Sequence, residues 1–295
     1  MLSGLLLWGA LYIGTATAIW FTCSAGKIIP AYFIFEMVCL APFTVWLFLL
    51  AARKGRAVVT GVLLETCVVA AVTYTVQVLA TLSGFWAYFQ DKDALLGPTI
   101  SGVPVEEFLF YPLTINFSML LYLWICDYIK SRRLPDINYS RRTLGLICIG
   151  FSVAFALLAA CVFTLRSPAQ VQPALKFWTQ SGIPRYLEGP RQYNWTLICL
   201  ISIAVNAVVF YLAELKTSLM LRAALILAGI FFLICLLVNL LGTGRGWWVY
   251  NGQQTSGIWI GGVPLEDLAV CLTGVTLPIS IFEATRTMLG EKGLP

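Results

Sequence analysis

Residues 101–107 read SGVPVEE, and residues 261–267 read GGVPLED. An aromatic block stands upstream of each copy, GFWAY at residues 84–88 and GWWVY at residues 246–250. The two aromatic blocks are 162 residues apart, and the two acidic blocks are 160 residues apart. The loop that joins an aromatic block to its acidic block is therefore two residues shorter in the second copy. A repeat of this kind indicates a duplicated architecture in which each half carries the same motif at the same place.

The composition of the chain indicates a membrane protein. Of its 295 residues, 59% are hydrophobic and 11% are charged, and the mean hydropathy is +0.85. Soluble domains carry about 45–50% apolar and about 25% charged residues. These values exclude a soluble enzyme, a disordered chain and a secreted disulfide scaffold. They favour a polytopic membrane protein.

Several kinds of site are excluded by what the sequence lacks. It contains no His, which excludes His general bases and most zinc sites, and we expect no metal centre. Its nine Cys include no CxxC pair and fall in apolar runs, as small membrane hydrophobes do. The net charge of +5 is spread along the chain, so we expect no nucleic-acid partner.

Eight stretches are long and apolar enough to cross a bilayer core, which takes about 20 helical residues. Lipid offers no hydrogen bonds to the backbone, and a barrel would alternate every second residue, so these stretches favour helices. The expected fold is all-α, with eight transmembrane helices arranged as two parallel four-helix repeats. The windows are 4–23, 31–52, 60–83, 105–126, 143–163, 194–213, 220–241 and 264–284.

The duplication also predicts the domain boundaries. We expect a first membrane repeat at 1–128, a basic linker at 129–142 and a second membrane repeat at 143–295. Gln77 and Asn239 correspond as well, each seven residues before the glycine of its aromatic block. Four helices per half is an even number, so the repeats would be related by an axis along the membrane normal.

The distribution of basic residues predicts the orientation. With eight spans both termini lie on one side of the membrane. Twelve of the 19 Lys and Arg fall in the loops and ends of that side, and seven fall on the side of the motif loops. The positive-inside rule therefore places both termini in the cytoplasm. Membrane lipid is an expected partner throughout.

The duplicated carboxylates are the candidate catalytic residues: Glu106, Glu107, Glu266 and Asp267. Consecutive helical residues point about 100° apart, so one acid of each pair can face the bundle interior while the other pairs or caps. A pair of carboxyls in an apolar site holds a proton at neutral pH and can serve as general acid and base. The alternative is helix capping, because acids at helix N-termini are favoured by the dipole.

The aromatic blocks are the candidate substrate-binding residues. Their rings, stacked beside buried acids, could stabilise a carbocation through their π-faces. The alternative is the interfacial aromatic belt of a membrane protein. Glu36 lies on the same side of the membrane and could join the site. The aromatic candidates are Phe85, Trp86, Tyr88, Trp247, Trp248 and Tyr250.

The paired W-x-Y and [GS]GVPxE[ED] elements resemble the integral-membrane lycopene cyclase family, the carotenoid cyclases of some bacteria and archaea and of the fungal cyclase domain. The resemblance covers about residues 30–126 and 193–285. In that family two aromatics usually follow the acids. Phe110-Tyr111 fits this pattern and makes Phe110 a further substrate-binding candidate, whereas the second half has Val270-Cys271, and Asp267 in place of the commoner Glu.

The resemblance implies a lycopene β-cyclase-like, redox-neutral isomerase or intramolecular lyase. An acid protonates a terminal double bond, an internal double bond closes a six-membered ring, and a base removes a proton. It implies a lipophilic polyene or isoprenoid substrate, no cofactor, and neighbouring carotenoid-pathway enzymes as further partners. The alternatives are a related membrane isoprenoid cyclase or hydratase with a different substrate, and a proton-coupled transporter with parallel repeats.

Overall fold

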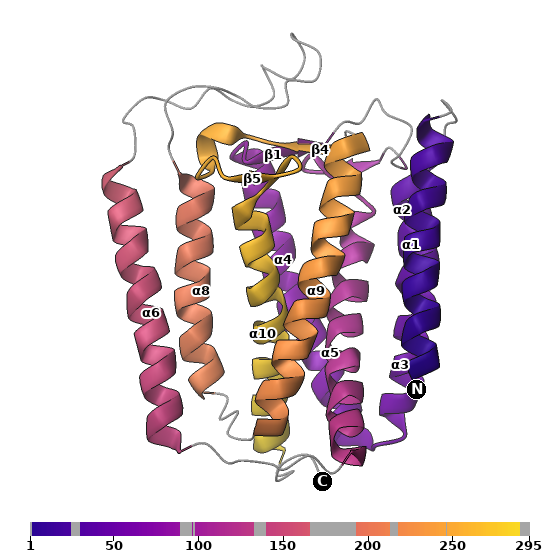
Figure 1. Ribbon diagram of the computed structural model, residues 1–295, viewed down its shortest axis with the longest axis vertical. Coiled ribbons are helices and arrows are strands. Elements are labelled where there is room, and N and C mark those ends of the chain that lie inside the picture. The colour runs from indigo at the N-terminus through magenta and orange to yellow at the C-terminus, as the bar shows by residue number, and fades with distance from the viewer. Residues whose placement is uncertain are drawn as a thin grey trace.

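The computed structural model describes residues 2–24, 30–88, 96, 98–132, 140–165, 193–212, 218–245 and 247–289. These residues are mostly helical, as the sequence predicts (Figure 1). The helices are α1 (Leu2–Ser24), α2 (Ala31–Cys39), α3 (Ala41–Ala52), α4 (Arg56–Leu82), α5 (Glu107–Ser131), α6 (Arg141–Thr164), α8 (Asn194–Leu212), α9 (Ser218–Arg245) and α10 (Leu265–Met288).

Seven helical spans among the described residues are long and apolar enough to cross a membrane. One of them, Ala31–Ala52, consists of α2 and α3 together. The break falls at Leu40 because Pro42, at the start of α3, has no N–H to continue the ladder. The Leu40 N–H still donates to the Glu36 carbonyl (3.0 Å), so α3 continues the course of α2. Within α1, the segment Leu7–Ile19 is apolar but shorter than the seven candidate spans. The eighth transmembrane helix, expected at 4–23, therefore stays a prediction.

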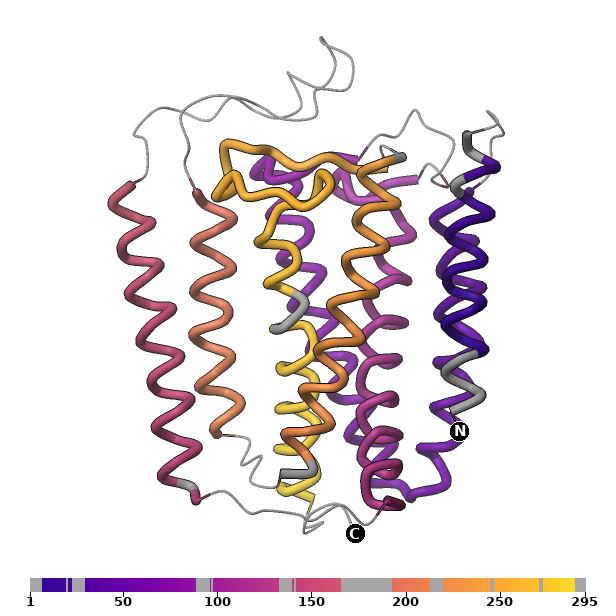
Figure 2. Tube along the Cα trace, viewed as in Figure 1, coloured from indigo at the N-terminus to yellow at the C-terminus, as the bar shows by residue number. Residues whose placement is uncertain are grey.

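Helices α4, α5, α9 and α10 form the centre of the bundle, with α5 packed on α4 and α9, and α10 packed on α4, α5 and α9. On one flank lie α1, α2 and α3, and Tyr12 of α1 donates to the Ile234 carbonyl of α9 (3.0 Å). On the other flank α6 packs against α8, and Figure 2 shows this pair at the edge of the bundle. The outer side chains of α6 are large and apolar, as contact with lipid requires.

Six short strands lie at one end of the bundle (Figure 1). β1 (Trp86–Tyr88) and β4 (Trp248–Tyr250) pair antiparallel, with Trp86 opposite Tyr250 and Tyr88 opposite Trp248. This register joins the two repeated aromatic blocks directly. The other strands form two hairpins, β2 (Thr99–Ile100) with β3 (Val103–Pro104), and β5 (Trp259–Ile260) with β6 (Val263–Pro264). The all-α expectation therefore agrees with the membrane-spanning helices but did not include these short strands.

The two residues before each Val-Pro of the motif make the turns of the two hairpins. Ser101 and Gly102 have φ of 54° and 81°, and Gly261 and Gly262 have φ of 60° and 96°. Two consecutive residues with positive φ are the signature of a type I′ hairpin turn. The prolines that follow, Pro104 and Pro264, end β3 and β6 and precede α5 and α10. A strand end tolerates proline because no ladder hydrogen bond is lost there.

Candidate functional site

A cavity of about 220 Å³ lies between the central helices beneath the β1–β4 pair. Both halves of the chain line it, and no Lys or Arg is among the described residues that do so. Glu107 and Asp267, the second acid of each motif, both face it. The remaining lining side chains are mainly aliphatic and aromatic. The cavity is therefore an apolar space with two carboxyl groups supplied by equivalent positions of the two repeats.

The two cavity-facing acids are held in equivalent ways. The Tyr32 hydroxyl of α2 donates to Glu107 Oε1 (2.9 Å), and the Trp195 indole N–H of α8 donates to Asp267 Oδ1 (3.1 Å). Each acid lies in the first turn of its helix, α5 or α10, where the helix dipole favours negative charge. Side chains from α2 and α8 thus fix the direction of each carboxyl.

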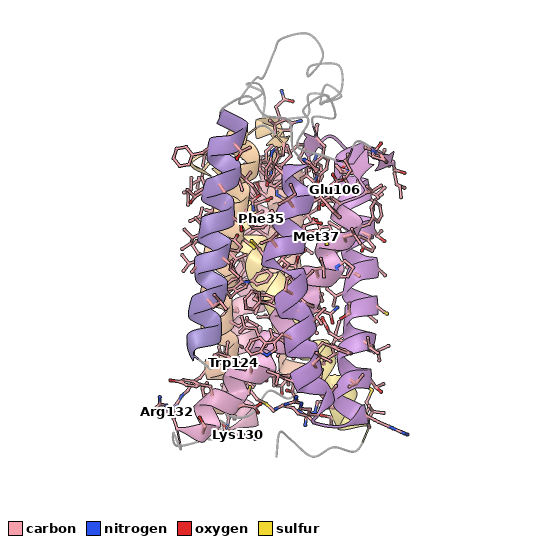
Figure 3. All side chains as sticks on the ribbon, turned by 90° about the vertical axis from the view of Figure 1, so that its right-hand side faces the viewer. Phe35, Met37, Glu106, Trp124, Lys130 and Arg132 are labelled. Atoms are coloured by element: carbon pink, nitrogen blue, oxygen red, sulfur yellow. The ribbon has the colours of Figure 1, made fainter. Side chains whose placement is uncertain are left out.

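The first acid of each motif has a different surrounding. Glu106 and Glu266 are buried, and neither lines the cavity. The backbone N–H of Leu96 donates to Glu106 Oε1, and that of Ser256 donates to Glu266 Oε1 (2.5 Å). Both bonds hold the loop that precedes the motif hairpin against the helix. Figure 3 shows Glu106 near one end of the bundle, with Lys130 and Arg132 at the opposite end.

Of the aromatic candidates, Trp86, Tyr88, Phe110, Trp248 and Tyr250 line the cavity. Phe85 and Trp247 are buried outside it. Phe85 packs against Trp86 and Trp195, and Trp247 packs against Trp248 and Tyr32. The two excluded rings support the rings that face the cavity.

Amide and phenol groups form one hydrogen-bonded cluster in each half of the chain. Gln77 Nε2 donates to the Tyr88 hydroxyl, and the Tyr111 hydroxyl donates to Gln77 Oε1 (2.7 Å). The Tyr250 hydroxyl is within hydrogen-bond distance of Asn239 Oδ1 (2.6 Å) and of Asp267 Oδ2. Because a phenol has one hydrogen, Tyr250 donates to one of these acceptors at a time. Gln77 and Asn239, which correspond in sequence, thus each contact the tyrosine of their own motif, Gln77 as a donor to Tyr88 and Asn239 as an acceptor for Tyr250.

Burial controls the protonation of the two motif tyrosines. Burial raises the pKa of Tyr88 well above its usual value, and the nearby Glu107 carboxyl raises it further. Burial likewise raises the pKa of Tyr250, and Asp267 adds to the rise. Both phenols therefore keep their protons at neutral pH and remain available as donors. A protonated phenol next to a carboxylate can stabilise it by donating a hydrogen bond.

The structure adds site residues that the sequence did not single out. Tyr32 and Trp195 line the cavity, and each lies at the start of a helix in an otherwise apolar stretch. The sequence feature that could have identified them is their equivalent position in the two halves. Each lies near the start of the second membrane span of its half. Glu36, which the sequence suggested for the site, is fully buried and does not line the cavity. Among the described residues, no three His, Cys, Asp or Glu side chains converge as a metal site would require.

The sequence matches the lycopene cyclase family over residues 30–125 and 192–285, which together make up more than half of the chain. The chain belongs to the lycopene cyclase family. The two matched regions coincide with the two motif-bearing halves, so the family resemblance read from the motifs is confirmed. Comparisons with curated proteins and with solved structures gave no match.

Membership of the lycopene cyclase family supports an enzyme of carotenoid cyclisation that acts on a lipophilic polyene in a membrane. The apolar spans support an integral, multi-pass membrane protein. The cavity meets the needs of such a substrate, because its walls are apolar and its polar groups are few and convergent. In this lycopene cyclase family member the acids of both repeats reach one cavity.

Proposed function

We propose that the chain is a cofactor-independent carotenoid cyclase in which Glu107 and Asp267 carry out proton-initiated ring closure. The observation that carries this proposal is the shared cavity, in which these two carboxyls are surrounded by aromatic rings. Carboxyls in an apolar site are suited to general acid and base work because desolvation favours their protonated form. The mainly apolar lining also disfavours the water that would trap a carbocation.

The reaction conserves atoms and electrons. A carboxylic acid gives its proton to the terminal double bond of an acyclic polyene end, which leaves a tertiary carbocation. An internal double bond attacks that cation, so a carbon–carbon bond closes a six-membered ring and the positive charge moves into the ring. A carboxylate then removes a neighbouring proton, and the ring double bond forms. Nothing is oxidised or reduced, so no nucleotide cofactor is needed.

The aromatic rings have a defined role in this scheme. Trp86, Tyr88, Phe110, Trp248 and Tyr250 present π-faces or edges around the space between the acids. A desolvated cation over an aromatic face gains about 2 kcal/mol or more. These rings would therefore lower the energy of the carbocation without capturing it. Phe85 and Trp247 would act through the rings they support.

Glu106 and Glu266 have a supporting role in this proposal. Each accepts a backbone N–H from the loop before its motif hairpin, and Thr196 adds a further donor to Glu266 (2.5 Å). These bonds orient the turn that presents Glu107 or Asp267 to the cavity. Removing one of these acids would loosen the loop rather than remove the reacting proton.

The size of the cavity supports a substrate that is only partly enclosed. At about 220 Å³ it is smaller than the roughly 300–1,000 Å³ of a typical ligand pocket. It would therefore hold one end of a long polyene, with the remainder extending between helices into the bilayer. Such a substrate reaches the site from the membrane and returns to it.

The membrane arrangement we propose has α1 as the eighth span and both termini in the cytoplasm. Supporting this, α1 begins and α10 ends at the end of the bundle opposite the strands (Figure 1). The β1–β4 register is consistent with a two-fold axis between the halves. The two aromatic blocks pair antiparallel, so that the Trp of each block lies opposite the Tyr of the other. The parallel-repeat arrangement and the boundaries at 1–128, 129–142 and 143–295 are part of the same proposal.

The test uses membranes that contain the protein and an acyclic polyene, with absorption spectra and chromatography of the products. Glu107→Gln and Asp267→Asn keep size and hydrogen bonding but lose the titratable proton. Each should lower the rate by about 10²–10⁴-fold, the usual contribution of a general acid or base. Glu106→Gln is the matched control, because it lies next to Glu107 outside the cavity, and its loss should be smaller.

Normal turnover by a folded Glu107→Gln, Asp267→Asn double variant would refute the acid–base role. Proton-coupled uptake of a solute into vesicles, together with failure to cyclise any polyene, would favour the transporter alternative. Addition of water to the polyene in place of ring closure would favour the hydratase alternative.

A further inference from the structure

One stripe of α4 is buried at its lower end and exposed at the level of the cavity. Its members recur every three or four residues and therefore share one face of the helix. Glu65 and Val69 are buried, whereas Val72, Val76 and Leu79 are 49%, 38% and 58% exposed. All of them lie within a candidate membrane span. The exposed part of the stripe therefore faces the apolar interior of the bilayer.

The equivalent stripe of α9 is closed along its whole length. Its residues follow those of α4 at a distance of 162, the spacing of the aromatic blocks. Ile234, Val238 and Leu241 are 7%, 6% and 6% exposed. Helix α1 packs on α9, and Tyr12 of α1 donates to the Ile234 carbonyl (3.0 Å). The first helix of the second half, α6, instead packs against α8 at the edge of the bundle (Figure 2). The two halves thus match in sequence but differ in which flank is covered.

Val76 connects the exposed face of α4 to the cavity. Of the described residues that line the cavity, it is the only exposed one. Val72 and Leu79, one turn before and after it, are exposed but do not line the cavity, so its exposed surface is continuous with theirs. The Thr73 hydroxyl beside it donates to the Val69 carbonyl within the same helix. The cavity therefore reaches the lipid-facing surface of α4 through an apolar edge.

The size of the cavity indicates what covers this face. A space of about 220 Å³ holds one end of a long polyene, so the rest of the molecule has to leave through an opening. The exposed face of α4 offers aliphatic side chains, which an apolar chain can cover without losing hydrogen bonds. A polyene whose end is held in the cavity is already tethered at Val76, whereas a free acyl chain is not. The outer part of the polyene is therefore the occupant that the cavity itself selects.

We propose that the face of α4 formed by Val72, Val76 and Leu79 is the entrance of the cavity and binds the part of the polyene that stays outside during ring closure. We call this face the α4 entrance. The proposal rests on the cyclase function proposed above and deepens it by placing the route to the site on one half of the chain. Helix α1 closes the second opening that the repeat would otherwise produce. The reacted end then leaves by the way it came.

Bulk placed outside the cavity wall tests the α4 entrance. Val72→Trp adds a large ring at the entrance, and Val72 itself does not line the cavity. The variant should lower kcat/KM for polyene conversion in liposomes severalfold, and Leu79→Trp should do the same. Leu64→Trp is the matched control, because Leu64 is 47% exposed, does not line the cavity and lies about two turns before Val72. It should keep the wild-type kcat/KM, and equal values for Val72→Trp and Leu64→Trp would overturn the entrance.

Photocrosslinking provides a readout that needs no turnover. Benzoylphenylalanine is introduced in place of Val72 or of Leu64 in a Glu107→Gln background, in liposomes that contain an acyclic polyene. Mass spectrometry should find the polyene attached in place of Val72 and phospholipid alone attached in place of Leu64. Phospholipid alone at both positions would show ordinary lipid contact, and a crosslink from Val72 to a second copy of the chain would show an interface between copies. Either result would overturn the entrance.

The two measurements separate the two proposals. If wild type cyclises no polyene but the polyene still crosslinks at Val72 and not at Leu64, the entrance stands and the cyclase function fails. If wild type cyclises and neither kcat/KM nor the crosslink distinguishes Val72 from Leu64, the cyclase function stands and the entrance fails.

Discussion

Gly242 on α9 lies directly beneath the ring of Trp248. A Cβ atom added to Gly242 would fall well inside van der Waals contact with the six-membered part of the indole. Trp248 lines the cavity and donates from its indole N–H to the Tyr250 hydroxyl (3.2 Å). Gly242→Ala should therefore displace the Trp248 ring, weaken its bond to Tyr250 and disturb the placement of Asp267. Both stability and cyclisation should fall.

The magnitude follows from two opposing effects. Replacing a helical glycine by alanine stabilises a helix by about 1 kcal/mol. Forcing an extra methyl group into a packed site costs about 1–3 kcal/mol. Gly229 is the matched control on the same helix, because a Cβ there would meet no atom within 4 Å. Gly242→Ala should therefore be less stable than Gly229→Ala by about 1–3 kcal/mol, the overpacking contribution alone.

Thermal unfolding of both variants in one detergent measures this difference, and polyene conversion measures the effect on the site. Trp248→Phe removes the ring atoms that the new methyl would meet, so it should restore stability to Gly242→Ala. Equal stability and equal activity of Gly242→Ala and Gly229→Ala would show that the Trp248 ring does not lie on Gly242, and would refute the reasoning.

Three further outcomes are expected. Trp86 lines the cavity, so Trp86→Phe, which keeps a π-face, should retain more cyclisation than Trp86→Leu; equal losses would remove the cation-stabilising role. Ser101 has a φ of 54° in the motif turn, so the free energy of unfolding of Ser101→Gly should exceed that of Ser101→Val by on the order of 1 kcal/mol or more; the reverse order would contradict the turn. In intact cells, a membrane-impermeant thiol reagent should label Ile100→Cys and not Lys54→Cys, relative to wild type; the opposite pattern would reverse the orientation.

The helical spans could be predicted from the sequence because a bilayer imposes their length and apolar character directly. The windows 31–52 and 194–213, for example, differ little from the span Ala31–Ala52 and from α8. The β1–β4 pairing was not predicted. It joins Trp86 to Tyr250 across more than half of the chain, and a three-residue strand has no periodicity that a sequence window can detect.

The site was predicted in composition but not in detail. The duplication singled out two acid pairs, and helix geometry allowed one member of each pair to face the bundle interior. Which member does so depends on where the helix begins after the hairpin, a matter of one residue that motif spacing leaves open. Tyr32 and Trp195 were missed because an aromatic near a helix end is typical of the membrane interface. Their hydrogen bonds to Glu107 and Asp267 become evident only in three dimensions.

The small volume of the cavity has a consequence for the order of products. If the proposed cyclase acts on a polyene with two identical ends, a space of about 220 Å³ holds one end at a time, and the two rings would close in separate visits. Between visits the molecule has to withdraw, reverse its direction within the bilayer and re-enter. Catalysis would then be distributive, and a singly cyclised pigment would accumulate early and decline as the doubly cyclised one appears. The absorption spectrum of the membrane over time would then report how often a singly cyclised molecule binds again after its release.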